Sequence, residues 1–142
     1  MSKFDVIIIG GGVVGSGVLR DLSLRGVKTL LVDRGDLASE ASGKNHGLLH
    51  SGARYVVSDP ESALECAEEN IILKKIAKHT IEDTGGLFVA TEEKSLEYLE
   101  PFLRGCSKCN VENKEITVEE ALEREPFLNP SIKAAVWVND AG

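Results

Sequence analysis

Three glycines near the N-terminus have the spacing of a phosphate-binding turn. Gly10, Gly12 and Gly15 follow the short β-branched run at residues 4–9 and precede a segment of helical periodicity. In such a turn the first glycine permits the sharp bend, the second lets a diphosphate approach the backbone, and the third lets helix and strand pack closely. The N–H groups at the helix start then face the phosphate oxygens. The pattern therefore predicts a dinucleotide site.

A carboxylate, Asp33, follows at the position where a dinucleotide-binding unit usually binds the adenosine ribose. Asp33 ends a second apolar run, residues 27–33, and can accept hydrogen bonds from the ribose hydroxyls of an adenosine. Its charge disfavours a ribose that carries a 2′-phosphate, although the adjacent Arg34 moderates that preference. The turn does not separate NAD from FAD, because both contain an ADP half. A glycine-rich turn that binds no ligand is the alternative interpretation.

The elements around these residues indicate an α/β protein with a Rossmann-like domain and a parallel sheet. Residues 4–9 and 27–33 are expected to form buried parallel strands, because each is a short apolar run bounded by turn residues. The helix between them is expected to end at Gly26. Its apolar positions recur at helical spacing: Val14, Val18, Leu19 and Leu22. Together they predict a right-handed βαβ unit.

The second half of the chain predicts further helices and strands. A long helix begins either with Asp59 as its cap and Pro60 at its first position, or with a capping box of Ser58 and Glu61. Its expected stripe is Ala63, Ala67 and Ile71, and its expected end is Gly85-Gly86. Strands are expected at residues 87–91 and 133–139, and helices at 94–109 and 117–125. We expect two regions: 1–90, a dinucleotide-binding region, and 91–142, the incomplete start of a mixed α+β substrate domain.

Composition narrows the possible partners. The formal net charge of -7 disfavours binding of nucleic acid through a basic surface. No apolar run is long enough to span a bilayer, and the N-terminus lacks the pattern of a secretory leader, so we expect a cytoplasmic protein. Cys106 and Cys109 form a C-x-x-C without a second pair nearby. We interpret that spacing as chance placement on an amphipathic helix and expect no metal site.

The segment that begins VIIIGGGVVGSGVLRDLSLRG and ends SGKNHGLLHSGARY resembles a known family. It is similar to the N-terminal region of the FAD-dependent glycerol-3-phosphate dehydrogenases, within the D-amino-acid-oxidase-like flavoprotein superfamily. The stretch SGKNHGLLHSGARY is most similar to the large catalytic subunit of the anaerobic type. Similarity is strongest up to GGLFVAT and looser afterwards, and the chain resembles the truncated N-terminal part of such an enzyme.

The resemblance implies FAD as the cofactor and sn-glycerol 3-phosphate as the substrate, which is oxidised to dihydroxyacetone phosphate by hydride transfer to the flavin. It implies that His50 lies near the isoalloxazine ring as a base or hydroxyl-orienting group, and that Arg54 binds the substrate. The alternative for Arg54 is a structural role in an ion pair with an acidic side chain. The alternative for His46 is a hydrogen bond to a backbone carbonyl, without contact to the cofactor. The expected cofactor-binding residues are Gly10, Gly12, Val14, Gly15, Asp33, Arg34, Ser42, Asn45, His46, Gly47 and Leu48.

Two rival functions stay open at this point. One keeps the flavin and changes the substrate to a 2-hydroxy acid, as in oxidases of the L-2-hydroxyglutarate type, although Arg54-Tyr55 and His46 favour the phosphate. The other is a non-catalytic nucleotide-binding fragment. By analogy with the family, the electrons pass to a quinone, to a redox subunit or to oxygen. The same analogy suggests peripheral association with the inner face of the cell membrane.

Overall fold

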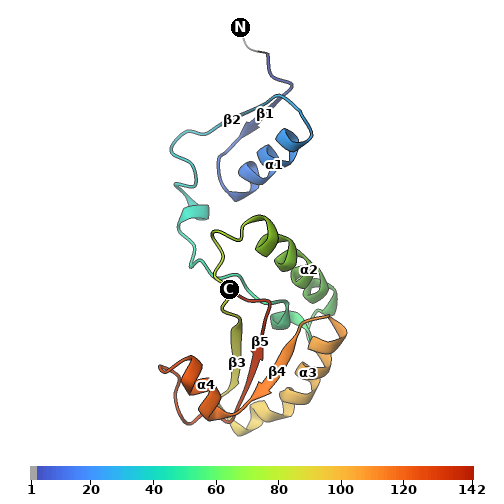
Figure 1. Ribbon diagram of the computed structural model, residues 1–142, viewed down its shortest axis with the longest axis vertical. Helices are drawn as coiled ribbons and strands as arrows, with labels where there is room; N and C mark the ends of the chain where they lie inside the picture. Colours follow the sequence, from blue (N-terminus) through green and yellow to red (C-terminus); the bar gives the residue numbers. More distant parts are fainter. Residues whose placement is uncertain (1–2) are drawn as a thin grey trace. The chain divides into compact units, whose positions relative to one another are not determined.

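The computed structural model describes residues 3–142, and the chain divides into two compact units. The first unit is Met1–Gly47 and the second is Leu48–Gly142 (Figure 1). Each unit contains its own sheet, one of two strands and one of three. The α/β class predicted from the sequence is confirmed, with a parallel strand pair and a separate antiparallel sheet. The predicted domain boundary at residue 90 stays a prediction.

The first unit has the βαβ order that the apolar pattern predicts, but the expectation of buried strands was wrong, because every residue of the two strands is half-buried or exposed. Strands β1 (Val6–Ile9) and β2 (Thr29–Val32) pair in parallel, with Val6 opposite Thr29 and Ile9 opposite Val32. Parallel neighbours need a long crossover, and helix α1 (Val13–Leu24) supplies it. Gly26, with φ +76°, follows the end of α1, and its N–H donates to the Ser23 carbonyl at 3.0 Å.

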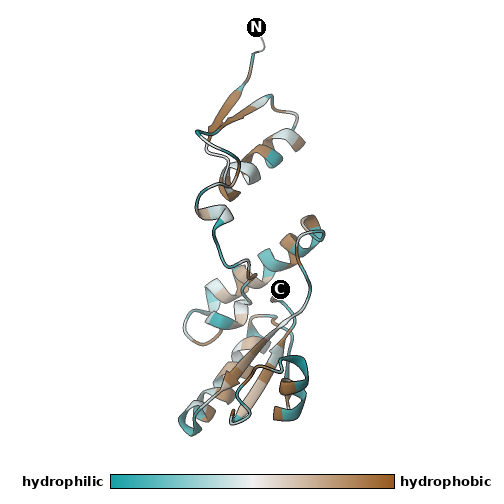
Figure 2. Cartoon of the chain, turned by 90° about the vertical axis from the view of Figure 1, so that its left-hand side faces the viewer, coloured by the Kyte–Doolittle hydropathy of each residue, from teal (hydrophilic) through white to brown (hydrophobic). Residues whose placement is uncertain are grey.

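Both faces of β1 carry apolar side chains. Val6 and Ile8 are partly buried, whereas Ile7 and Ile9 are 61% and 88% exposed. Figure 2 shows this strand in the colour of hydrophobic residues. A strand with apolar residues on both faces is typical of the interior of a parallel sheet, where helices cover both sides.

The second unit is built on an antiparallel sheet in the order β3-β5-β4. Its strands are β3 (Gly86–Ala90), β4 (Asn113–Ile116) and β5 (Ala134–Val138). The central strand β5 is strongly apolar, as its place between two partners requires. Strand β4 is not predicted from the sequence, because Asn-Lys-Glu-Ile has none of the apolar alternation that marks a strand; pairing with β5 makes it one.

Helices cover both faces of this sheet. Val136 and Val138 pack with Phe102 of α3 (Leu99–Lys108) and with the buried alanines of α2 (Pro60–Ile76). Ala135 points the other way and packs with Ala121 of α4 (Val118–Arg124). The alternation along β5 thus divides the core into two clusters, one on each side of the sheet.

Two helix starts follow the sequence closely. Asp59 caps α2: its Oδ1 accepts from the Ser62 N–H at 3.2 Å, and Pro60 takes the first helical position. This outcome selects the Asp59 cap over the alternative box of Ser58 and Glu61. At α4 the Thr117 hydroxyl accepts from the Glu120 N–H at 3.1 Å, and the Glu120 carboxylate accepts from the Thr117 N–H at 3.0 Å.

Other helix expectations were wrong. Helix α2 ends at Ile76 instead of reaching Gly85, because the backbone leaves the helical conformation at Ala77 and turns there, with the Thr80 N–H donating to the Ala77 carbonyl at 2.9 Å. Ile71 is 68% exposed, whereas Asn70 is buried in its place. The helix expected at 94–109 is a 3-10 turn (Glu93–Tyr98) followed by α3.

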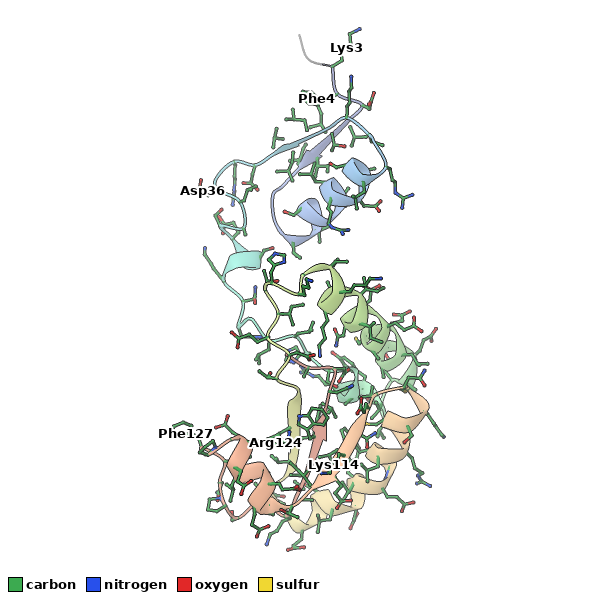
Figure 3. All side chains as sticks on the ribbon, in the orientation of Figure 1. Lys3, Phe4, Asp36, Lys114, Arg124 and Phe127 are labelled. Atoms are coloured by element: carbon green, nitrogen blue, oxygen red, sulfur yellow. The ribbon has the colours of Figure 1, made fainter. Side chains whose placement is uncertain are left out.

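Side chains on the α4 side include a cation over an aromatic ring. The Arg124 guanidinium lies 5.4 Å from the centre of the Trp137 ring, and Figure 3 labels Arg124 beside α4. Such a contact adds modestly to the packing of α4 on the sheet. Phe127, just after α4, is 97% exposed.

Both cysteines of the C-x-x-C lie in the core of the second unit. Burial, followed by the charge of Asp140, raises the pKa of Cys106 to about 11, so the thiol stays protonated and unreactive. Within residues 3–142 no three histidine, cysteine or acidic side chains gather as a metal site would require. Over the same residues, no helix combines the length and the apolar composition needed to cross a membrane.

Candidate functional site

The glycine turn between β1 and α1 has the geometry that the sequence requires of it. Gly10 has φ +106°, a conformation that L side chains rarely adopt. A Cβ on Gly15 would collide with the Gly10 carbonyl oxygen, so the first turn of α1 touches the backbone at the end of β1. Only glycine at position 15 permits that approach, which leaves the first N–H groups of α1 at the strand end.

Ser42 lies at the start of α1. Its Oγ accepts a hydrogen bond from the Val13 N–H at 3.0 Å, and a Cβ on Gly12 would lie 2.8 Å from the same oxygen. The hydroxyl keeps its own proton, which it can donate to an anionic oxygen bound at the helix start. Val14 follows in the first turn with 75% of its surface exposed.

Asp33 joins the end of β2 to the glycine turn. Its Oδ2 accepts from the Gly11 N–H at 2.6 Å, and its Oδ1 accepts from the Gly35 N–H at 2.9 Å. These donors, Gly11 first, hold the pKa of the Asp33 carboxyl below its ordinary value. Each oxygen retains a lone pair for a further donor such as a sugar hydroxyl. Gly11 was not predicted as a site residue, although its place between two motif glycines was a signal.

The residues after Ser42 use their polar groups to shape the chain. Asn45 donates from Nδ2 to the Ser42 carbonyl at 2.6 Å, and its Oδ1 accepts from the Gly47 N–H at 2.6 Å. Gly47 has φ +75° and sits where a side chain would be strained. Arg34 pairs with Glu40 at 3.2 Å on the surface, a pair that contributes at most about 1 kcal/mol.

In the second unit, one cavity brings together the two predicted catalytic residues. His50 and Arg54 both line a space of about 360 Å³, whose other walls include residues 84–88 and 141–142. Arg54 belongs to the short 3-10 helix Gly52–Tyr55, where the Ser51 hydroxyl caps the Ala53 N–H at 2.9 Å. Arg54 also lines a second cavity of about 310 Å³, which is mostly apolar.

Two residues that were not predicted from the sequence hold this segment in place. Asn70 of α2 is 4% exposed, and its Nδ2 donates to the carbonyls of His50 at 2.8 Å and Asp140 at 3.1 Å. Asp140 is 8% exposed and accepts the Gly52 N–H at 2.8 Å. The helical spacing of Ala63, Ala67 and Asn70 was a signal that Asn70 faces inward.

The predicted site residues therefore fall into two groups. Gly10, Gly12, Val14, Gly15, Asp33, Arg34, Ser42, Asn45, His46 and Gly47 belong to the first unit, and Leu48, His50 and Arg54 to the second. Within the first group, hydrogen bonds and close contacts connect the glycine turn to Asp33 and Ser42. In the second group, all three residues line one cavity.

A βαβ unit with this glycine turn and an ionised carboxylate at the second strand is typical of the class of dinucleotide-binding proteins. Residues 5–142 match the family described as "DAO: FAD dependent oxidoreductase", and the chain belongs to that family. The predicted family and its cofactor, FAD, are confirmed.

Curated proteins with similar sequences have names that are more specific than the family description. The chain is 52% identical over 136 residues to a subunit of the anaerobic glycerol-3-phosphate dehydrogenase of Haemophilus influenzae, and 50% identical over 136 residues to the subunit of the same name in Escherichia coli. These matches cover 96% of this chain and 24% and 25% of the relatives. The chain thus spans about a quarter of the length of the curated relatives that it matches.

A solved structure gives the same fold. L-alpha-glycerophosphate oxidase from Mycoplasma pneumoniae, reduced with dithionite and with FAD bound, matches with a TM-score of 0.75 and 29% identity. The match covers 99% of this chain and 38% of the oxidase chain.

The packing at Gly15 predicts a sharp contrast between two substitutions in one helix. Gly15→Ala places a methyl group against the Gly10 carbonyl, whereas a Cβ on Gly17 has nothing within 4 Å. We expect Gly15→Ala to lower the free energy of unfolding by about 2 kcal/mol or more. Gly17→Ala, the matched control, should raise it by about 0.5–1 kcal/mol. Urea titration followed by circular dichroism measures both, and equal effects would contradict the described contact.

The hydrogen bonds to Asp33 predict a pH dependence. Because its pKa is lower in the folded chain than the ordinary 3.8, Asp33 stabilises the fold fully above that value, and the contribution is lost as pH falls through the lowered pKa. A ¹³C NMR titration should place the carboxyl inflection below 3.8, and the Gly11 amide proton should titrate with it. Asp33→Asn should abolish that inflection at Gly11. An inflection at or above the ordinary value would refute the hydrogen-bonded geometry.

Proposed function

We propose that the gene product that carries this chain oxidises sn-glycerol 3-phosphate to dihydroxyacetone phosphate with FAD as the electron acceptor. The observation that carries the proposal is the 50–52% identity to subunits named for this dehydrogenase, over a stretch that includes both cavity residues, His50 and Arg54. The named oxidase that shares the fold, with FAD bound, supports the same substrate class.

The first unit supports binding of the ADP half of FAD. The diphosphate would lie at the start of α1, where N–H groups and the helix dipole favour negative charge and the Ser42 hydroxyl can donate. Asp33 is ionised and has acceptor capacity left for the ribose hydroxyls. The remaining proposed contacts in this unit are Gly10, Gly12, Val14, Gly15, Arg34 and residues 45–47, and Leu48 is the one proposed from the second unit.

Arg54 is the proposed phosphate-binding residue. Its planar guanidinium presents paired donors that match two phosphate oxygens, a geometry that lysine does not reproduce. It lines the same cavity as His50, so a three-carbon phosphate held by Arg54 would have its hydroxyl groups within the space that His50 borders.

His50 is the proposed base or hydroxyl-orienting group. Oxidation at C2 requires the hydroxyl proton to leave to a base and the C2 hydrogen to leave with its electron pair. When bound, FAD supplies the acceptor for that hydride at its flavin ring. A histidine takes up such a proton near neutral pH. Membrane association and a redox partner protein stay predictions drawn from the family resemblance.

The function is tested on the purified gene product. We expect bound FAD, seen as flavin absorbance, and anaerobic bleaching of that absorbance by glycerol 3-phosphate. L-2-hydroxyglutarate is the comparison substrate, because its carboxylates would also suit Arg54. If only L-2-hydroxyglutarate bleaches the flavin, the hydroxy acid and not glycerol 3-phosphate is the substrate. A protein that takes up no FAD would support the rival interpretation of a non-catalytic fragment.

Substitution of Arg54 tests how the substrate is bound. Arg54→Ala removes the paired donors, and we expect kcat/KM for glycerol 3-phosphate to fall roughly 10- to 100-fold, the cost of charge-assisted hydrogen bonds. Arg54→Lys should recover only part of that loss. Arg104→Ala is the matched control, since Arg104 forms an exposed pair with Glu100 at 3.6 Å. Steady-state kinetics measures all three, and an unchanged kcat/KM in Arg54→Ala would remove Arg54 from the site.

A further inference from the structure

The segment that carries His50 has no regular secondary structure of its own before Gly52, so its backbone groups need partners elsewhere. Leu49 and Gly142 exchange two backbone hydrogen bonds, at 2.7 and 3.1 Å. The His50 carbonyl accepts from Asn70 Nδ2 at 2.8 Å, and the Gly52 N–H donates to Asp140 Oδ2 at 2.8 Å. Three attachments therefore hold the chain between residues 49 and 52.

Asn70 joins the two stretches of chain that meet there. Its Nδ2 donates both to the His50 carbonyl and to the Asp140 carbonyl, so both of its amide protons are used. One turn later on the same helix face, Lys74 Nζ donates to the Asn139 carbonyl at 2.6 Å. Helix α2 thus holds residues 139–140 and residue 50 from one side, by side chains that are four residues apart.

Asp140 contributes its side chain as well as its carbonyl. Oδ2 accepts the Gly52 N–H, whereas Oδ1 is buried and has no hydrogen bond within residues 3–142. A buried acceptor without a partner costs free energy, so the structural role of this side chain belongs to the other oxygen. That role is to hold Gly52, the first residue of the turn that carries Arg54.

We propose that Asn70 and Asp140 are positioning residues of the proposed glycerol-3-phosphate oxidation: together they fix the His50 carbonyl and the Gly52 N–H, so that His50 and Arg54 face one cavity. This inference rests on the proposed function. Neither residue lines the cavity that His50 and Arg54 share. They act through the backbone, where a displacement of a reacting group by about 1 Å can cost roughly 100-fold in rate.

Asn70→Asp is the most selective variant. It keeps the size of the side chain but replaces the NH2 group, and with it both donors, by one acceptor oxygen, which then faces the carbonyl oxygens of His50 and Asp140. We expect kcat per bound flavin in the gene product to fall roughly 10- to 100-fold, with KM for glycerol 3-phosphate changed much less, because Arg54 still binds the phosphate. Asn113→Asp is the matched control: Asn113 also donates to a carbonyl, that of Val111 at 3.0 Å, and does not line this cavity.

A conservative pair at Asp140 provides the second readout. Asp140→Asn keeps an oxygen for the Gly52 N–H and places its NH2 group where Oδ1 now lacks a partner, so it should retain most of kcat. Asp140→Ala should lower kcat per bound flavin to the same extent as Asn70→Asp. A merely structural role would instead lower the unfolding midpoint and the FAD content of Asp140→Ala and Asn70→Asp while kcat per bound flavin stayed at the wild-type value.

Amide exchange separates failure of this proposal from failure of the proposed function. In the wild-type gene product the Gly52 amide should be protected, and Asp140→Ala should expose it while Asp140→Asn restores protection. If the wild-type protein does not oxidise glycerol 3-phosphate, the proposed function fails and exchange alone decides whether residue 52 is held. Equal protection of Gly52 in wild type and Asp140→Ala, or an unchanged kcat per bound flavin in Asn70→Asp, overturns the positioning role.

Discussion

Backbone groups outside regular secondary structure must still be hydrogen-bonded when they are buried, and this requirement shapes the second unit. The chain around His50 passes beside α2 and the end of β5 without joining either the helix or the sheet. The Asn70 amide donates to the His50 carbonyl, and the Asp140 carboxylate accepts from the Gly52 N–H. Because these partners come from residues far apart in the sequence, the cavity bordered by His50 and Arg54 exists only when the whole unit is folded.

The first unit depends on a different constraint, the absence of side chains at chosen positions. Contact between the α1 backbone and the Gly10 carbonyl leaves no room for a Cβ on Gly15. That contact brings the helix start to the end of β1, and Gly11 places its N–H on Asp33. The start of α1 and an ionised carboxylate then lie at the ends of two neighbouring strands, which is the arrangement proposed for the phosphate and sugar groups of the nucleotide.

Membership of the FAD-dependent oxidoreductase family explains why one chain combines these two constructions. A flavin must be held by its distant ADP half while its ring meets a substrate elsewhere, so binding and chemistry need separate sets of residues. The apolar residues on both faces of β1 are typical of a strand in the interior of a parallel sheet.

The sequence by itself determined what short-range physics controls: the βαβ unit, the glycine turn, the helix starts near Asp59 and Thr117, and the family through its motif. Sterics and capping act within a few residues, so a local pattern is enough to predict them. Tertiary structure alone decided that β4 is a strand and that the Asn70 side chain bonds to the carbonyls of His50 and Asp140. Those outcomes depend on partners distant in the sequence, such as β5 and Asp140, whose contacts no local periodicity encodes.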